Sequence, residues 1–293
     1  MSRETIAGVA TVKQLCAAFD VSRQAYYAAR KGPVVAPKVV RLPIRPDVAP
    51  VGLVLEKIRL IIDENAAWGV RKVWATLRRE HELKVSKKRV WAIMKANGLV
   101  LARDSEPGEP TRGHVAVPEP NRRLAADFTT VWTKVDGVVA VVPTIDCGCR
   151  SILGMVVTKD QQAPAILASI EQALRETFGR PGAVPLDLEL RSDHGPQYTG
   201  ADCAELVRRW GLEHTFAPVG RPTGNAVVER FIRTLKEEVI WLRDWNTATE
   251  LREAINAWLV KYHTRRAHQS LGWMTPSEYR AAHLSSPVAQ AAA

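Results

Sequence analysis

The feature that most constrains the fold is a change of apolar pattern near residue 122. Upstream of it, apolar residues recur at helical spacing, whereas downstream three largely apolar runs follow one another with tight turns between them. Such runs predict β-strands at 124–132, 137–144 and 150–157. Further strands are expected at 186–191 and 213–215, and helices at 164–178, 201–210, 225–243 and 247–263. The order βββαβαβα predicts a mixed α/β sheet with helices on its faces.

The first 121 residues predict two small helical modules, each followed by a linker. Residues 11–30 fit two short helices joined by a tight turn, the arrangement of a helix-turn-helix. Residues 51–98 fit three helices, of which the third is capped by Ser86 and closed by Gly98 in a left-handed conformation. The intervening segments are rich in proline, or in proline, glycine and charge, which is typical of linkers.

The net charge of +10 is concentrated in the first third of the chain. The first 103 residues hold 20 basic and 8 acidic side chains, whereas the rest of the chain is slightly acidic. This asymmetry indicates a nucleic-acid-binding front end on a catalytic back end. The alternative for such helices is an ordinary solvated charged face. The candidate DNA-contact residues in this region are Ser22, Arg23, Gln24, Arg71, Lys72, Arg78, Arg79, Lys87, Lys88 and Arg89.

Composition excludes several classes of protein. A hydrophobic content of 46% rules out wholesale disorder, and the sequence contains no long uninterrupted apolar run that predicts a membrane span. Four cysteines without a CxxC pair make neither a disulfide framework nor a zinc site, so we expect no structural zinc and a reducing, cytoplasmic location. We expect no membrane partner.

Three acidic residues stand where a sheet of this kind places ligand sites. Asp127 lies on the first predicted strand, Asp193 just past the fourth, and Glu229 in the first turns of the long helix. Carboxylate oxygens suit Mg²⁺, and three carboxylates can hold two such ions about 3.5–4 Å apart for in-line phosphoryl transfer. Taken singly, each acid also has a structural explanation, as a turn or edge residue or as a solvent-facing helix residue.

The segments around these acids resemble OrfB-type transposases of the insertion sequence 3 family, which are relatives of retroviral integrases. The family's D, D(35)E signature is matched by residues 127–129 (DFT), 192–198 (SDHGPQY), 225–229 (NAVVE) and Lys236. Residues 262–276 (YHTRRAHQSLGWMTP) resemble the family's C-terminal motif, and residues 68–94 resemble its upstream helical domain. The resemblance covers nearly the whole chain.

The resemblance implies an α/β ribonuclease H-like catalytic core, with a mixed five-stranded sheet and helices on both faces, preceded by small all-α helix-turn-helix DNA-binding domains. It assigns Asp127, Asp193 and Glu229 as catalytic and metal-binding residues. It implies two Mg²⁺ ions per active site, with Mn²⁺ as a substitute. Lys236 and Arg233 share a helix face with Glu229 and are expected to contact DNA. His194 replaces the family's usual Arg or Asn, and three roles are open for it: proton transfer, contact with DNA, or stabilisation of its turn.

The expected division of the chain combines both lines of reasoning. The predicted parts are a helix-turn-helix (1–31), a Pro-rich linker (32–50), a helical DNA-binding domain (51–102), a second linker (103–121), the catalytic core (122–245) and a C-terminal helical extension with a tail (246–293).

The expected activity is that of a DNA transposase that binds insertion-element ends and catalyses Mg²⁺-dependent 3′-end cleavage and strand transfer. Its partners would be the terminal inverted repeats, target DNA, further copies of the chain in a dimer or larger synapse, and an OrfA protein as partner or fusion. A nucleoid location follows from these partners. Three readings stay open: this transposase, a DNA-binding regulator or inactive transposase-derived scaffold, and a nuclease that cuts without joining.

Overall fold

A computed structural model describes residues 16–22, 25–26, 49–101, 117–218 and 225–284. The chain divides into two compact units, residues 1–48 and 49–293. In the first unit, the backbone N–H of Ala25 donates to Ser22 Oγ over 3.1 Å, as expected of a helix cap. The rest of the predicted helix-turn-helix lies outside the described residues, including Arg23 and Gln24.

The second unit begins with three helices, α3 (Val51–Glu64), α4 (Val70–Arg79) and α5 (Lys87–Ala96). Their apolar faces meet in one small core, because each helix repeats its apolar residues at helical spacing. The N–H of Arg89 donates to Ser86 Oγ over 3.3 Å, and Gly98 has a φ of +68°. The predicted cap and left-handed terminator of α5 are therefore confirmed.

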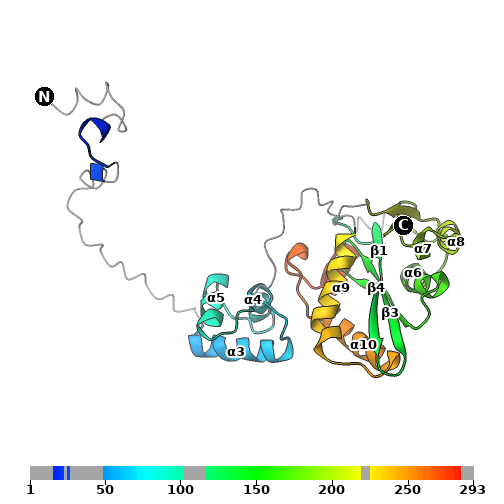
Figure 1. The fold of residues 1–293 in the computed structure, drawn as a ribbon, viewed down its shortest axis with the longest axis horizontal. Helices are drawn as coiled ribbons and strands as arrows, with labels where there is room; N and C mark the ends of the chain where they lie inside the picture. Colours follow the sequence, from blue (N-terminus) through cyan, green and yellow to red (C-terminus); the bar gives the residue numbers. More distant parts are fainter. Residues whose placement is uncertain (1–15, 23–24, 27–48, 102–116, 219–224, 285–293) are drawn as a thin grey trace. The chain divides into compact units, whose positions relative to one another are not determined.

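A mixed sheet forms the centre of the remaining chain (Figure 1). Its strands are β1 (Arg123–Ala126), β2 (Thr129–Thr133), β3 (Gly137–Asp146), β4 (Ile152–Thr158), β5 (Glu189–Ser192) and β6 (Glu213–Phe216). The sheet has six strands and not the expected five, because the first predicted strand is divided into β1 and β2, which both pair with β3. β5 is parallel to β1 and β6 is parallel to β5, whereas the other pairings are antiparallel.

The break between β1 and β2 differs from the single strand expected over 124–132. The backbone N–H of Phe128 donates to Asp127 Oδ1 over 2.8 Å. Because the carboxylate takes this donor, the N–H is lost to the ladder and the strand is interrupted. Asp127 consequently stands at the end of β1 and not inside a continuous strand.

Helices cover both faces of the sheet (Figure 1). One face packs against α6 (Ala163–Phe178) and α8 (Ala201–Trp210), the other against α9 (Ala226–Glu238) and α10 (Ala248–Thr264). Alternate residues of β1 serve the two layers: Leu124 and Ala126 join the first core, and Ala125 joins the second.

Close packing of α6 on the sheet depends on one glycine. A Cβ atom at Gly154 of β4 would lie 1.9 Å from the carbonyl oxygen of Ser169 in α6. Only glycine lets the strand and the helix approach this closely.

Two helices were not expected from the sequence, α7 (Pro196–Thr199) and α11 (Pro276–Leu284). α11 attaches the C-terminal segment to the core, because Arg280 Nη1 donates to the fully buried Asp146 over 3.1 Å. Among the described residues, no helix is long and apolar enough to span a membrane.

Candidate active site

Asp127 and Asp193 stand beside each other at the carboxyl edge of the sheet. β1 and β5 are parallel neighbours whose register pairs Ala125 with Arg191, and each aspartate comes two residues later. Extending this register by two residues sets the two aspartates opposite one another, on strands about 4.8 Å apart. Both strands are largely buried up to this edge, so both carboxylates are positioned by the core beneath them.

The loop after β5 holds the second carboxylate. The N–H of Gly195 donates to Asp193 Oδ1 over 2.9 Å. A Cβ atom at Gly195 would lie 2.9 Å from that same oxygen, so a larger residue would displace the carboxylate or the loop. Glycine at this position therefore allows the close approach that fixes the Asp193 side chain.

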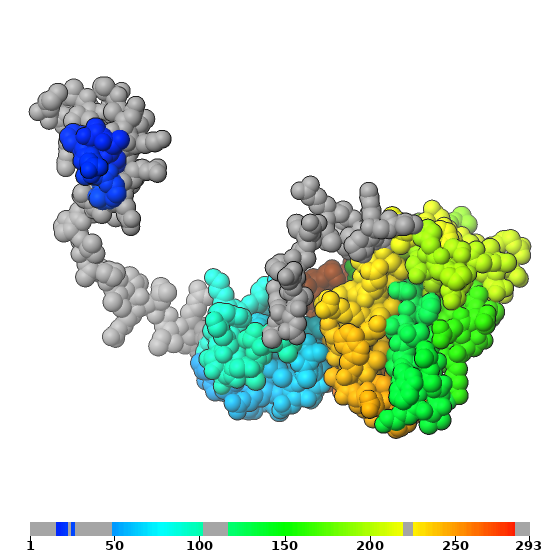
Figure 2. Space-filling view, viewed as in Figure 1, coloured from blue at the N-terminus to red at the C-terminus, as the bar shows by residue number. Residues whose placement is uncertain are grey.

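Asn225 connects the third acid to the first. Its side chain is almost fully buried at the start of α9, and its Nδ2 donates to the carbonyl oxygen of Ala126 over 3.2 Å. The N–H of Glu229 in turn donates to the Asn225 carbonyl over 3.2 Å, one helical turn later. Asn225 thus ties the first turn of α9, with Glu229 on it, to the end of β1 beside Asp127. In the space-filling view α9 (yellow) lies beside the first strands (green) (Figure 2).

The electrostatics of Asp127 place all three acids and Lys236 in one neighbourhood. The pKa of Asp127 is raised from 3.8 to about 6, first by burial and then by the charges of Asp193 and Glu229, although the Phe128 N–H and the Lys236 ammonium oppose this rise. Partial burial also raises the pKa of Glu229. A group of carboxylates that disfavours its own ionisation is a site suited to a cation.

The donor set fits a hard divalent metal ion. Asp127 and Asp193 each use one oxygen for an N–H of their own loop, and no other described residue donates to the second oxygen of either. All three side chains offer oxygen ligands, which Mg²⁺ prefers. In the described part of the chain, no three His, Cys, Asp or Glu side chains lie close enough together to hold a metal ion.

Two polar groups of this site had no role assigned from the sequence, although they lie in the motif segments 192–198 and 225–229. Tyr198 is buried, its hydroxyl has no hydrogen-bond partner among the described residues, and burial together with the charges of Asp127 and Asp193 raises its pKa. Asn225 Oδ1 is buried and unpaired in the same way. The signal that could have identified them is their place in these motifs, since Tyr198 ends the first segment and Asn225 begins the second.

The other predicted DNA-contact residues of the core differ in their surroundings. His194 is exposed and stacks on Phe216, with ring centroids 4.9 Å apart. Arg233 is exposed and forms an ion pair with Glu237 at 2.8 Å. Lys236 is half-buried and close enough to Asp127 to affect its pKa.

Three basic residues of the helical module contact the rest of the second unit, which the sequence did not indicate. Lys72 Nζ lies 2.7 Å from Glu238 Oε1 on α9. Arg71 donates to the Gln269 side chain, and Arg79 donates to the Trp273 carbonyl. Nothing in the sequence pattern distinguishes these three residues from their neighbours.

The remaining basic residues of the module lie elsewhere. Arg78 and Lys87 stand over the Trp74 ring, at 5.3 and 5.1 Å from its centroid. Lys88 is exposed in the first turn of α5, and Arg89 beside it is half-buried. These four residues lie on α4 and α5, which makes their helices the candidate DNA-facing part of the module.

Sequence comparisons agree with this architecture. Two family models described as integrase core domains match residues 117–222 and 210–276, and one described as an HTH-like domain matches residues 53–104. The chain is 30% identical over 238 residues to transposase InsD for insertion element IS2A/D/F/H/I/K of Escherichia coli, covering 77% of this chain and 77% of the relative. The chain belongs to the OrfB-type DDE transposases of the insertion sequence 3 family.

The transposase is similar to further proteins of the same kind. Transposase InsD for insertion element IS2-9 of Escherichia coli (strain K12) is 30% identical over 77% of this chain and 76% of the relative. Among solved structures, the catalytic core domain of BIV integrase matches 58% of this chain and 99% of that chain, with 23% identity and a TM-score of 0.43. A simian T-cell lymphotropic virus intasome matches 73% of this chain and 74% of that chain, with 15% identity and a TM-score of 0.45.

Proposed function

We propose that this transposase cleaves the 3′ ends of its insertion element and joins them to target DNA, using divalent metal ions held by Asp127, Asp193 and Glu229. The observation that carries the proposal is that Asp127 and Asp193 follow neighbouring parallel strands, while Asn225 ties the first turn of the helix with Glu229 to the end of β1. Burial and the charges of the other two acids also raise the pKa of Asp127. Neighbouring carboxylates, of which Asp127 and Asp193 are partly buried, repel one another at a free-energy cost that a bound cation offsets.

The metal in this proposal is Mg²⁺, with Mn²⁺ as a substitute, and two ions occupy each active site. Held there, Mg²⁺ supplies the positive charge that stabilises the attacking and leaving oxygens of a phosphodiester. Asp127 and Asp193 serve as ligands from the strand edge, and Glu229 serves from α9. Asn225 acts as a positioning residue, because it ties the helix that carries Glu229 to the strand that ends at Asp127.

Other side chains bind the DNA in this account. Lys236, close to Asp127, and Arg233 one turn before it offer positive charge to phosphates beside the reacting bond. His194 presents an exposed ring for stacking or hydrogen bonding. Arg78, Lys87, Lys88 and Arg89 of the helical module, with Ser22, Arg23 and Gln24 of the first unit, contact the terminal inverted repeats.

The proposal includes the partners that the reaction needs. Water and then the DNA 3′-OH act as nucleophiles, so no covalent protein–DNA intermediate forms. Joining two element ends requires two active sites, which implies a dimer or larger synapse. The transposase acts with an OrfA protein, as a partner or fusion, at the bacterial nucleoid.

The test uses DNA that carries the inverted repeats flanking the gene. We expect the wild-type chain with Mg²⁺ to nick the 3′ ends and join them to a second duplex, and Asp193→Asn to abolish both products. Asp202→Asn is the matched control, since it makes the same change at an exposed residue in the first turn of α8. Strand transfer by Asp193→Asn at the wild-type rate would show that the catalytic assignment is wrong.

The same assay separates the two alternatives. A chain that binds the repeats but does not cut them, whichever divalent ion is supplied, is a regulator or scaffold. A chain that releases cleaved ends without joining them is a nuclease.

A further inference from the structure

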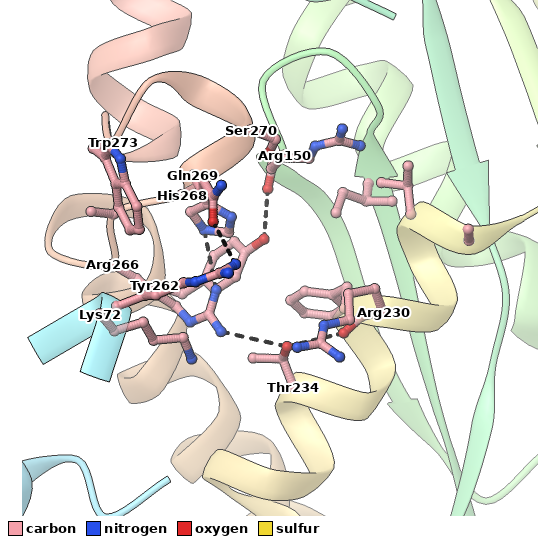
Figure 3. Close-up of a pocket in the computed structure, with 16 residues that line it drawn as sticks. Lys72, Arg150, Arg230, Thr234, Tyr262, Arg266, His268, Gln269, Ser270 and Trp273 are labelled. Carbon is pink, nitrogen blue, oxygen red and sulfur yellow. Dashed lines mark hydrogen bonds between the residues drawn. The ribbon is translucent and has the colours of Figure 1, made fainter. Parts of the chain in front are cut away.

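A cavity of about 390 Å³ lies beside α9, and Glu229 is not among the residues that line it (Figure 3). Arg230 and Thr234 of α9 line one side of it. The segment after α10, with Arg266 and Gln269, lines another side, and Lys72 reaches it from α4. The three catalytic acids do not line this space, whereas Arg71 and Lys72, two of the DNA contacts expected from the sequence, do.

The lining of the cavity is strongly basic. Five cationic side chains line it, and none of its described lining residues is acidic: Arg71, Lys72, Arg150, Arg230 and Arg266. The nearest carboxylate, Glu238, is shared, since one of its oxygens lies 2.7 Å from Lys72 Nζ and 3.1 Å from Arg266 Nη2. Among the described residues, Arg150 and Arg230 have no carboxylate partner.

Lys72, Arg150 and Arg266 are partly or largely withdrawn from water, which makes their mutual repulsion costly. Arg71 and Arg230 are exposed. The Arg266 side chain is only 9% exposed. Burial and then the Arg266 charge lower the pKa of Lys72 to about 8, although Glu238 opposes them. Burial and the charges of Arg266, Lys72 and Arg150 likewise hold the pKa of His268 well below its usual range. The cavity therefore has a positive potential that a single carboxylate does not cancel.

We propose that this cavity binds a phosphate group from the backbone of DNA, at a site separate from the three catalytic acids. The guanidinium groups of Arg150 and Arg230 suit phosphate oxygens, and Gln269 and Ser270 add neutral polar groups at the rim. The volume lies at the lower end of the ~300–1,000 Å³ usual for ligand sites.

The position of the cavity favours DNA as the source of the phosphate. Arg230 directly follows Glu229 in the chain, so a strand whose reacting bond lies at the triad has neighbouring phosphates close to the cavity. This step rests on the proposed function, because it takes DNA as the substrate at the triad.

The test measures the binding of a short fluorescent DNA duplex to the full chain over a range of salt concentrations, without divalent ions, so that no cleavage occurs. Loss of one phosphate contact lowers the slope of log K against log salt by about 0.9. We expect Arg230→Gln and Arg150→Gln each to lower the slope by about this amount and to weaken binding about tenfold. The matched control is Arg252→Gln, an exposed arginine of α10 away from the cavity, which should keep the wild-type slope. Circular dichroism checks that the variants are folded.

Two results would overturn the proposal. Wild-type slopes in both cavity variants would mean that the cavity contacts no DNA phosphate. If inorganic pyrophosphate raises the melting temperature of the wild type but not of Arg230→Gln, and the DNA slopes are unchanged, the ligand is a free phosphate compound and the assignment to DNA is wrong.

The test of the cavity and the test of the proposed function can fail separately. Cleavage and joining by the wild type, with unchanged slopes in the variants, would reject the cavity alone. Strand transfer by Asp193→Asn would reject the proposed function while the salt slopes still report on the cavity.

Discussion

Burial and neighbouring charges together raise the pKa of the Asp127 carboxyl group. Its pKa in the folded chain, about 6, lies above its ordinary value of 3.8. Between these two pH values the folded chain keeps a proton that the unfolded chain releases. The contribution of this group to stability is therefore present at low pH, and is lost as the pH rises toward and past 6.

Because the pKa of Asp127 is raised, removing its charge should increase the free energy of unfolding, and the increase should depend on pH. Without divalent ions, Asp127→Asn should be more stable than the wild type by about 2–3 kcal/mol near pH 8, at about 1.4 kcal/mol per pKa unit. The difference should shrink toward pH 4, and Mg²⁺ should reduce it by stabilising the wild type alone. Urea unfolding at several pH values measures it. A difference that does not vary with pH would contradict the assigned cause.

The unpaired hydroxyl of Tyr198 gives a second prediction at this scale. Removing a buried hydroxyl that has no partner relieves a desolvation penalty of about 1 kcal/mol. Tyr198→Phe should therefore unfold at a higher temperature than the wild type when divalent ions are absent, as measured by calorimetry. A clear loss of stability would mean that the hydroxyl is hydrogen-bonded in solution.

At the residue scale, the sequence indicates the candidate acids but not the residues that position them. Asp127, Asp193 and Glu229 could be proposed because each lies in a recognisable motif, on a predicted strand, just past a strand and in the first turns of a helix. The contact between Asn225 and the Ala126 carbonyl joins residues 99 positions apart, and only the folded chain brings them together. Local pattern carries no information on such a pair.

At the element scale, the buried ion pair between Asp146 and Arg280 gives the sharpest prediction. Asp146 is fully buried and also accepts hydrogen bonds from the N–H groups of Asn121 and Gly148. Removing one partner of a buried pair typically costs about 3–5 kcal/mol, because the other charge is left without compensation. Arg280→Met should therefore lower the free energy of unfolding by roughly this amount in urea.

The control for this prediction is an exposed ion pair in the same helix. Glu278 of α11 pairs with Arg79, and both side chains are substantially exposed. Its carboxylate also accepts from the Thr275 N–H at the helix start, so Glu278→Gln, which keeps an acceptor, should cost less than about 1 kcal/mol. Equal losses in the two variants would show that Asp146 and Arg280 are not held as a buried pair.

The elements themselves were largely predictable, with informative exceptions. The helix ends at Ser86 and Gly98 follow from cap chemistry that is local in the sequence. The interruption after β1 depends on one side-chain hydrogen bond, from Phe128 to Asp127, inside a segment that otherwise has a strand pattern. α11 was missed because it is attached through Arg280 and not through an apolar stripe that a pattern could reveal.

At the scale of the whole molecule, the helical module and the core contact each other through specific side chains. Trp74 of α4 meets Trp273 edge-on, with ring centroids 5.4 Å apart, and Lys72 pairs with Glu238. Glu238 also pairs with Arg266 and is nearly buried. These contacts predict that the module and the core unfold in one transition.

A double variant tests this coupling. Trp273→Ala with Glu238→Gln removes the ring contact and the shared carboxylate, so the module should unfold separately and earlier. Calorimetry should show two transitions in place of one, and residues 49–101 should become sensitive to protease first. A single transition in the variant would mean that other contacts join the two parts.

The charge distribution predicted the organisation of the molecule but not the use of each charge. The basic first third correctly indicated the helical module that matches an HTH-like domain. Yet Arg71, Lys72 and Arg79 contact the C-terminal part of the chain, since their partners come from sequence positions far away. Composition cannot distinguish a cation that faces solvent from one that has an internal partner.

The most direct test of the account is whether the three acids act as one catalytic unit. The measurement is the rate of Mg²⁺-dependent cleavage and joining of DNA bearing the element ends, for Asp127→Asn, Asp193→Asn, Glu229→Gln and the corresponding double variants. We predict that each single variant loses at least about a thousandfold in rate and that the double variants lose little more, because groups that act together are not additive. Joining within tenfold of the wild-type rate by any single variant would contradict the account.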